Sequence, residues 1–150
     1  MKRLLAIIFI LILSLTLTSC SHIEDTNGPD DYSLVKISDE EILGVRSAST
    51  KIGAFESQTG RTIKVKVSKF SGVENLQSFK TTNSDITFTV SVTVTSGNFK
   101  AVLVQEGKII HTFNNNASNQ VVTVKQGTGT VSFYVAGESA KYNITLEYDN

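Results

Sequence analysis

Residues 85–97, DITFTVSVTVTSG, alternate apolar and polar side chains with a strict period of two, and this pattern constrains the fold more than any other feature of the chain. Such alternation sends successive side chains to opposite faces of a strand. The segment is rich in β-branched residues, which suit a pleated sheet and pack poorly against a helical turn. We therefore predict a half-buried strand whose core-facing residues are Ile86, Phe88, Val90, Val92 and Val94.

The rest of the C-terminal region repeats this pattern in short segments separated by turn residues. Glycine-containing turns are expected at residues 96–98, 106–107 and 137–139, and the polar run NNNASNQ is expected to form a loop. With no helical pattern between them, about seven strands favour an antiparallel all-β domain. We predict a small β-sandwich, immunoglobulin-like in general form but without the hallmark cysteines and tryptophan, and a small β-barrel is the alternative.

The N-terminus has the pattern of a secretory signal. A positive head, Met1-Lys2-Arg3, precedes an apolar run over residues 4–17, and the small residues Thr18 and Ser19 follow it. The apolar run is shorter than the ~18–20 residues that a transmembrane helix needs. We therefore predict a signal peptide over residues 1–19 that is removed, rather than a permanent span.

The end of this segment carries the single cysteine of the chain. Leu17-Thr18-Ser19-Cys20 resembles the lipobox of bacterial lipoproteins, and the resemblance covers residues 1–20 only. It implies that the Cys20 sulfur receives a diacylglyceryl group, that cleavage occurs before Cys20, and that the new N-terminus can be acylated. The expected location is a bacterial cell membrane or outer membrane, on the extracytoplasmic side; an ordinary secreted protein whose cleavage site ends in cysteine is the alternative.

Residues 20–60 are expected to link this anchor to the β-domain. Residues 20–41 contain seven acidic groups and one basic group, a formal charge of −6, and the beginning of this range has the composition of a hydrated tether. Ser38 and Glu41 have the spacing of a capping box, so we expect a short helix before Gly44. The predicted organisation is a signal peptide over 1–19, a tether with a short helix over 20–60, and a β-sandwich domain over 61–150.

The sequence gives little support to catalysis. His111 alternates with apolar residues and His22 lies in the tether, so no metal-binding set or catalytic pair can be assembled from the two histidines. Ser33 and Lys36 form an isolated S-x-x-K that lacks its accompanying motifs. We predict that the protein is not an enzyme and binds no metal or cofactor. We also predict that it does not bind nucleic acid, because the basic residues of the domain are dispersed.

A noncovalent binding function is therefore predicted. If Val131, Phe133 and Val135 face the core, Tyr134 points outward and can serve as an aromatic contact. The polar loop supplies the other candidate contacts, Asn114, Asn115, Asn116 and Asn119. The expected function is a lipid-anchored envelope lipoprotein that contacts the membrane through Cys20 and an envelope protein or glycan through its β-domain; a passive structural or assembly accessory of the envelope is the alternative.

Overall fold

One antiparallel sheet contains all six strands of the part of the chain that the structure describes, residues 37–44, 47–81, 84–126 and 129–149. The structure is a computed structural model. The strand order is β1-β2-β6-β3-β4; the sixth strand, β5, is not part of this order and pairs with β3. The all-β antiparallel prediction is confirmed. The elements are α2 (Asp39–Gly44), β1 (Ala48–Thr59), β2 (Thr62–Lys80), β3 (Ile86–Gln105), β4 (Lys108–Phe113), β5 (Ala117–Val124) and β6 (Thr130–Asp149).

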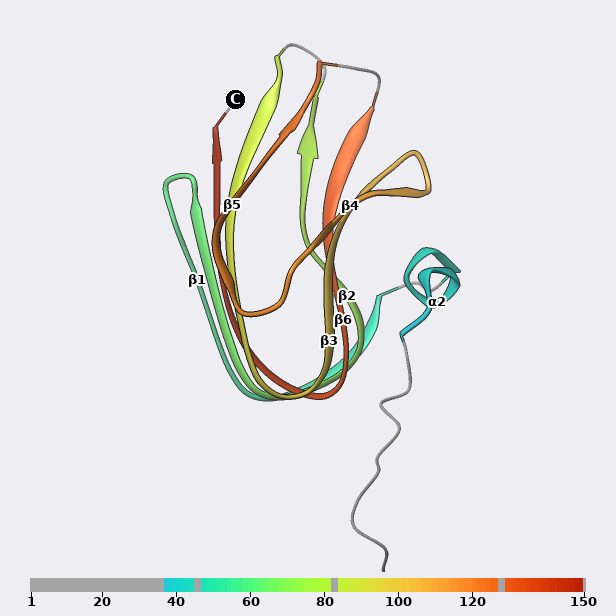
Figure 1. The fold of residues 1–150 in the computed structure, drawn as a ribbon, viewed down its shortest axis with the longest axis vertical. Helices are drawn as coiled ribbons and strands as arrows, with labels where there is room; N and C mark the ends of the chain where they lie inside the picture. Colours follow the sequence, from blue (N-terminus) through green and yellow to red (C-terminus); the bar gives the residue numbers. More distant parts are fainter. Residues whose placement is uncertain (1–36, 45–46, 82–83, 127–128, 150) are drawn as a thin grey trace, which may run out of the picture. The chain divides into compact units, whose positions relative to one another are not determined.

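The sheet is folded over on itself because its three longest strands bend together. Figure 1 shows β2, β3 and β6 turning side by side at the lower end of the sheet. On one side of the bend lies a five-stranded layer in the order β1-β2-β6-β3-β5, and on the other lies a four-stranded layer in the order β2-β6-β3-β4. Three strands, β2, β6 and β3, thus contribute to both layers of this sandwich-like unit.

Glycines mark the bend. Gly72 of β2 pairs with Gly137 of β6, and Gly97 of β3 has a φ of 74° beside two register shifts between β3 and β6. Glycine and bulges let a strand change direction without reversing the chain. The turns predicted at residues 96–98 and 137–139 are therefore wrong, since both are bends within continuous strands. Two expected pairs of strands are single strands, β3 and β6.

The space between the two layers holds the main hydrophobic core. Ile86, Phe88, Val90 and Val92 are buried, as the alternation predicts, whereas Val94 is partly buried and packs against the core edge. Alternate residues of β2 and β6 are buried in the same way, and the placement of Val131, Phe133 and Val135 toward the core is confirmed. The buried residues of these two strands include Ile63, Val65, Val67, Val131, Phe133, Val135, Tyr142, Ile144 and Leu146.

Helix α2 covers the outer face of the four-stranded layer. Ile42 is buried in a second, smaller cluster with Val73, Val102 and Ala136. The predicted capping box is present, because the Ser38 N–H donates to Glu41 Oε2 at 3.0 Å and the Glu41 N–H donates to Ser38 Oγ at 3.2 Å. Asp39 forms an ion pair with Lys100 of β3, which ties the first turn of the helix to the sheet.

The sheet begins earlier in the chain than residue 61, where we predict the boundary of the β-domain. β1 lies within the range assigned to the tether, and it pairs with β2 through a tight hairpin at Gly60 and Arg61. Its core-side positions include Lys51, Glu56 and Gln58 instead of large apolar residues, so the alternation that identifies the other strands is missing. Gly60, with a φ of 58°, is the one sequence feature here that indicates the hairpin turn.

Candidate functional site

The outer edge of β1, which we call the β1 edge, is the longest open edge of the sheet. Among the described strands, β1 pairs with β2 alone along its 12 residues. The opposite side of the sheet ends in two shorter strands, β4 with 6 residues and β5 with 8. An open edge presents unpaired N–H and C=O groups, which can accept another strand. The β1 edge is thus the best-formed template for strand addition in this part of the chain.

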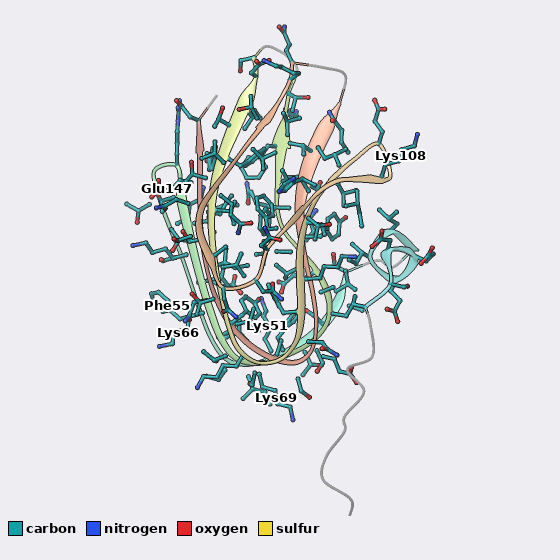
Figure 2. All side chains as sticks on the ribbon, viewed as in Figure 1. Lys51, Phe55, Lys66, Lys69, Lys108 and Glu147 are labelled. Carbon is teal, nitrogen blue, oxygen red and sulfur yellow. The ribbon has the colours of Figure 1, made fainter. Side chains whose placement is uncertain are left out.

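Two large apolar side chains are exposed on β1. Ile52 is 58% exposed and Phe55 is 62% exposed. Phe55 lies opposite Lys66 of β2, and Figure 2 shows both at the outer surface of the sheet. A single exposed apolar residue is ordinary on a soluble protein. Two such residues three positions apart on an open edge, however, provide apolar contacts beside the backbone groups that a partner strand would bind.

The inner side of β1 carries a charged cluster, which we call the Lys51 cluster and define as Lys51, Glu56, Glu74 and Tyr142. The Lys51 ammonium donates to Glu74 Oε1 at 2.7 Å and also to Glu56 Oε1. Burial lowers the pKa of Lys51, but the hydrogen bonds to Glu56 and Glu74 outweigh it, and the pKa lies above its ordinary value. Lys51 therefore remains a cation at neutral pH.

Tyr142 forms the buried end of this cluster. Its ring packs against Phe70 and Phe99, with centroid distances of 5.6 and 4.3 Å, and its hydroxyl has no hydrogen-bond partner among the described residues. Burial raises the pKa of Tyr142, and the charges of Glu74 and Glu56 raise it further. Because Lys51 stays charged and Tyr142 stays neutral, neither is available as a base at neutral pH. The cluster therefore fixes the position of the Lys51 ammonium beside two carboxylates.

Tyr134, one of the predicted contact residues, lies on the outer face of the sheet as expected, but α2 lies over that face. It is half-buried and packs against the small cluster around Ile42. A hollow of about 220 Å³ remains beside it, lined in part by Leu43, Val104 and Ser132. The structure thus places Tyr134 beneath a helix rather than on an open platform, and its contact role stays a prediction.

The predicted polar loop is shorter than expected, because β5 begins at Ala117. The side chains of this loop form hydrogen bonds with the backbone of β3, in the stretch between its pairing with β5 and its pairing with β4. Asn116 Oδ1 accepts from the Val94 N–H at 2.8 Å, and Asn115 Nδ2 donates to the Phe99 carbonyl at 2.9 Å. These two asparagines take the place of a strand partner along this stretch of β3.

The other two predicted loop contacts also lie beside internal hydrogen bonds. The Asn114 N–H and carbonyl are both bonded by the Gln120 side-chain amide, at 2.7 and 3.0 Å. The Asn119 N–H donates to Ser91 Oγ at 3.0 Å. A contact role for the four asparagines stays a prediction, but their positions already have a structural explanation.

The remaining sequence candidates are dispersed. His111 lies in β4, with its ring 4.7 Å from that of Phe113, in agreement with a packed histidine on a short edge strand. The described residues contain no group of three or more His, Cys, Asp or Glu side chains that could hold a metal ion. Cys20, His22, Ser33 and Lys36 lie outside the described residues.

Comparison with known proteins finds no matching family model, no matching curated protein and no matching solved structure. Over the described ranges, no helix is long and apolar enough to cross a membrane. The sequence analysis did not identify the β1 edge or the Lys51 cluster, since both depend on a strand that lacks alternation. The turn at Gly60 directly before the strand RTIKVKV was the available signal for a hairpin.

Proposed function

We propose that this chain is a lipid-anchored protein of a bacterial envelope whose β-domain binds another polypeptide by strand addition at the β1 edge. The anchor is supported by the signal-like N-terminus and by the lipobox-like Leu17-Thr18-Ser19-Cys20. Two or more acyl chains would make membrane attachment stable, whereas one chain binds only marginally. The domain would then present its binding edge to other molecules at the membrane surface.

The observation that carries the binding function is the open 12-residue edge of β1 with its exposed Ile52 and Phe55. Backbone N–H and C=O groups recognise another backbone, so this edge favours a polypeptide partner over a glycan. A sugar site would call for an exposed aromatic platform. The chain has no tryptophan, and Tyr134 is half-covered beneath α2, which leaves a glycan as the weaker alternative.

The anchor is tested by the intact mass of the protein extracted from membranes. A mature chain that begins at a lipid-modified Cys20 is expected, and Cys20→Ala should prevent both the modification and the cleavage. A mature chain that begins elsewhere, or an unmodified Cys20, would contradict the anchor.

Edge binding is tested by crosslinking in intact cells with a matched pair of variants. Phe55→Glu places a charge on the β1 edge opposite Lys66 of the same chain, so the pairing of β1 with β2 is kept, whereas Val121→Glu places the same charge on β5 at a position that is 64% exposed. Loss of the crosslinked partner in the Phe55 variant alone supports the proposal. Equal retention in both variants would remove β1 from the binding site.

A further inference from the structure

We infer that the partner of the β1 edge is the β1 edge of a second copy of this chain, paired antiparallel about a two-fold axis between Gly53 and Ala54. This inference rests on the proposed use of the edge and adds the identity of its occupant. In an antiparallel self-pairing, the numbers of opposing residues add to a constant. For the inferred register that constant is 107.

The charges of β1 are complementary in this register. Lys51 is the only basic residue of the strand and Glu56 the only acidic one, and they face each other across the pair twice, once on each side of the axis. A constant of 102 would oppose Lys51 to its own copy, and 112 would oppose Glu56 to its own copy. Opposite charges directly across a ladder stabilise pairing, and like charges disfavour it.

The exposed apolar residues are complementary in the same register. A constant of 107 places Ile52 opposite Phe55 of the second copy, and Phe55 opposite Ile52. Each of these side chains is more than half exposed in the single chain. The pairing would therefore cover part of the two exposed large apolar side chains of β1, beside the newly formed backbone ladder.

The two faces of the strand allow this odd-numbered register. Lys51 lies opposite the buried Phe70, and Glu56 lies opposite the buried Val65, so both face the inner side although their numbers differ in parity. In a regular strand such residues would lie on opposite faces. β1 changes face at Gly53, which has a φ of 60°. Figure 2 shows Lys51 on the inner side of the bend and Phe55 on the outer side.

The change of face also selects among registers. In every pair whose two members lie on opposite sides of Gly53, an even constant would set an inner residue against an outer one, which a continuous sheet does not permit. Among odd constants, 105 opposes Lys51 to Ala54 and 109 opposes it to Gln58, so neither pairs the charges. In the register of 107, positions on different faces oppose each other only where Gly53 meets Ala54 of the other copy. Glycine has no side chain that could point to the wrong face.

Such a pairing ends at two copies. The contact is isologous, so each chain contributes its single β1 edge and leaves no second β1 edge for another chain. The Lys51 to Glu74 hydrogen bond can persist, since the ammonium has three donors. The bend at Gly53 and the inward charges discourage pairing with unrelated straight strands, which is how natural edges avoid aggregation.

The register is tested by cysteine crosslinking of the full-length protein in its native membrane. Cys20 is the only cysteine of the chain and is consumed by the proposed lipidation, so introduced cysteines would be the only free thiols. Two copies with different tags, one carrying Ile52→Cys and the other Phe55→Cys, should form a mixed disulfide under mild oxidation. Directly opposed residues lie about 4.5–5.5 Å apart between Cα atoms, within disulfide range.

The controls use the same strand. Ile52→Cys paired with itself is offset by three residues, roughly 10 Å along the strand, which is too far for a disulfide. Ile52→Cys paired with Ser57→Cys tests the register of 109. A mixed 52–55 crosslink several-fold stronger than either control, and its loss on adding Lys51→Gln and Glu56→Gln with the fold intact by circular dichroism, supports the inference. A crosslink no stronger than the controls overturns it.

A second measurement separates this inference from the proposed function. The native mass of the detergent-solubilised protein should be that of a dimer for the unmodified chain and for Val121→Glu, and that of a monomer for Phe55→Glu. A monomer throughout, with a different polypeptide still lost on Phe55→Glu, overturns self-pairing and leaves edge binding standing. A dimer that persists in Phe55→Glu overturns self-pairing through β1.

Discussion

Gly72 of β2 faces Gly137 of β6 across the ladder at the point where both strands bend. A Cβ atom on Gly137 would lie 2.7 Å from Cδ1 of Phe70 and 3.0 Å from the Cβ of Ala140. The absence of a side chain at Gly137 lets the buried Phe70 ring fill the inside of the bend, against Tyr142. A Cβ atom on Gly72 would instead overlap the backbone of Ala48 in β1. The fold therefore depends on glycine at positions where an ordinary strand would prefer a β-branched residue.

Gly97→Ala should destabilise the protein much more than Gly60→Ala. Both glycines have a left-handed backbone, with φ values of 74° and 58°. A Cβ on Gly97 would overlap the backbone of Ser139, whereas a Cβ on Gly60 would meet nothing within 4 Å. We expect a loss of about 1 kcal/mol in unfolding free energy for Gly60→Ala and at least about 3 kcal/mol for Gly97→Ala. Urea unfolding of the two variants measures this, and equal losses would show that the bend tolerates a side chain.

These glycines also show where sequence reasoning reached its limit. The alternation in residues 85–97 correctly assigns the inner and outer faces of β3 as far as Val94, because burial acts on each side chain locally. Whether a strand bends or reverses at a glycine, however, depends on which residues pair on either side of it. Gly97 and Gly137 resemble turn residues in the sequence, and only the continuous pairing of β3 with β6 distinguishes a bend from a turn.

The candidate site was less accessible to sequence reasoning than the core. The Lys51 cluster joins β1, β2 and β6, and its members are up to 91 positions apart in the numbering, from Lys51 to Tyr142. Tyr134 was correctly assigned to the outer face, but the helix that covers it comes from a segment with only two apolar residues, Ile42 and Leu43. The packing of α2 over Tyr134 depends on the tertiary arrangement, and the hydrophobic periodicity of the sequence does not reveal it.

Tyr142→Phe should stabilise the protein at neutral pH and flatten its loss of stability in alkali. Its hydroxyl is buried without a partner among the described residues, so removing it should raise the free energy of unfolding by about 1 kcal/mol. Burial, and then the charges of Glu74 and Glu56, raise the pKa of Tyr142 in the folded state. Below pH 10.0, the ordinary value, the hydroxyl is neutral in both states, and the free energy of unfolding does not depend on its ionisation. As the pH rises from there through the folded-state pKa, the unfolded chain ionises first, so the free energy of unfolding falls.

The measurement is urea unfolding at several pH values, with Tyr148→Phe as the control for loss of a tyrosine hydroxyl. Lys51 adds a slope in the same direction above pH 10.5, because its pKa is also raised, so the Tyr142 variant should keep part of the alkaline loss. A profile for Tyr142→Phe that runs parallel to the unmodified protein above pH 10 would contradict this account.

Asn116→Gly should destabilise the protein although it keeps the backbone free to adopt the observed φ of 57°. The Asn116 side chain accepts a hydrogen bond from the Val94 N–H, and its loss leaves that group unpaired where β3 leaves β5. We expect a loss of about 1 kcal/mol in unfolding free energy. Asn116→Asp keeps the acceptor and should be close to neutral by comparison. If the glycine and aspartate variants are equally stable, the hydrogen bond contributes nothing measurable.

A fragment of residues 37–150 should fold cooperatively, whereas a fragment of residues 61–150 should be less stable by several kcal/mol. The shorter fragment loses β1, which exposes the edge of β2, and it also loses Ile42, which is 2% exposed beneath α2. Removing one buried apolar side chain of this kind typically costs about 2–5 kcal/mol. A fragment of residues 47–150 keeps β1 without α2 and separates the two contributions. Circular dichroism with urea unfolding measures all three, and a 61–150 fragment as stable as 37–150 would restore residue 61 as the start of the folding unit.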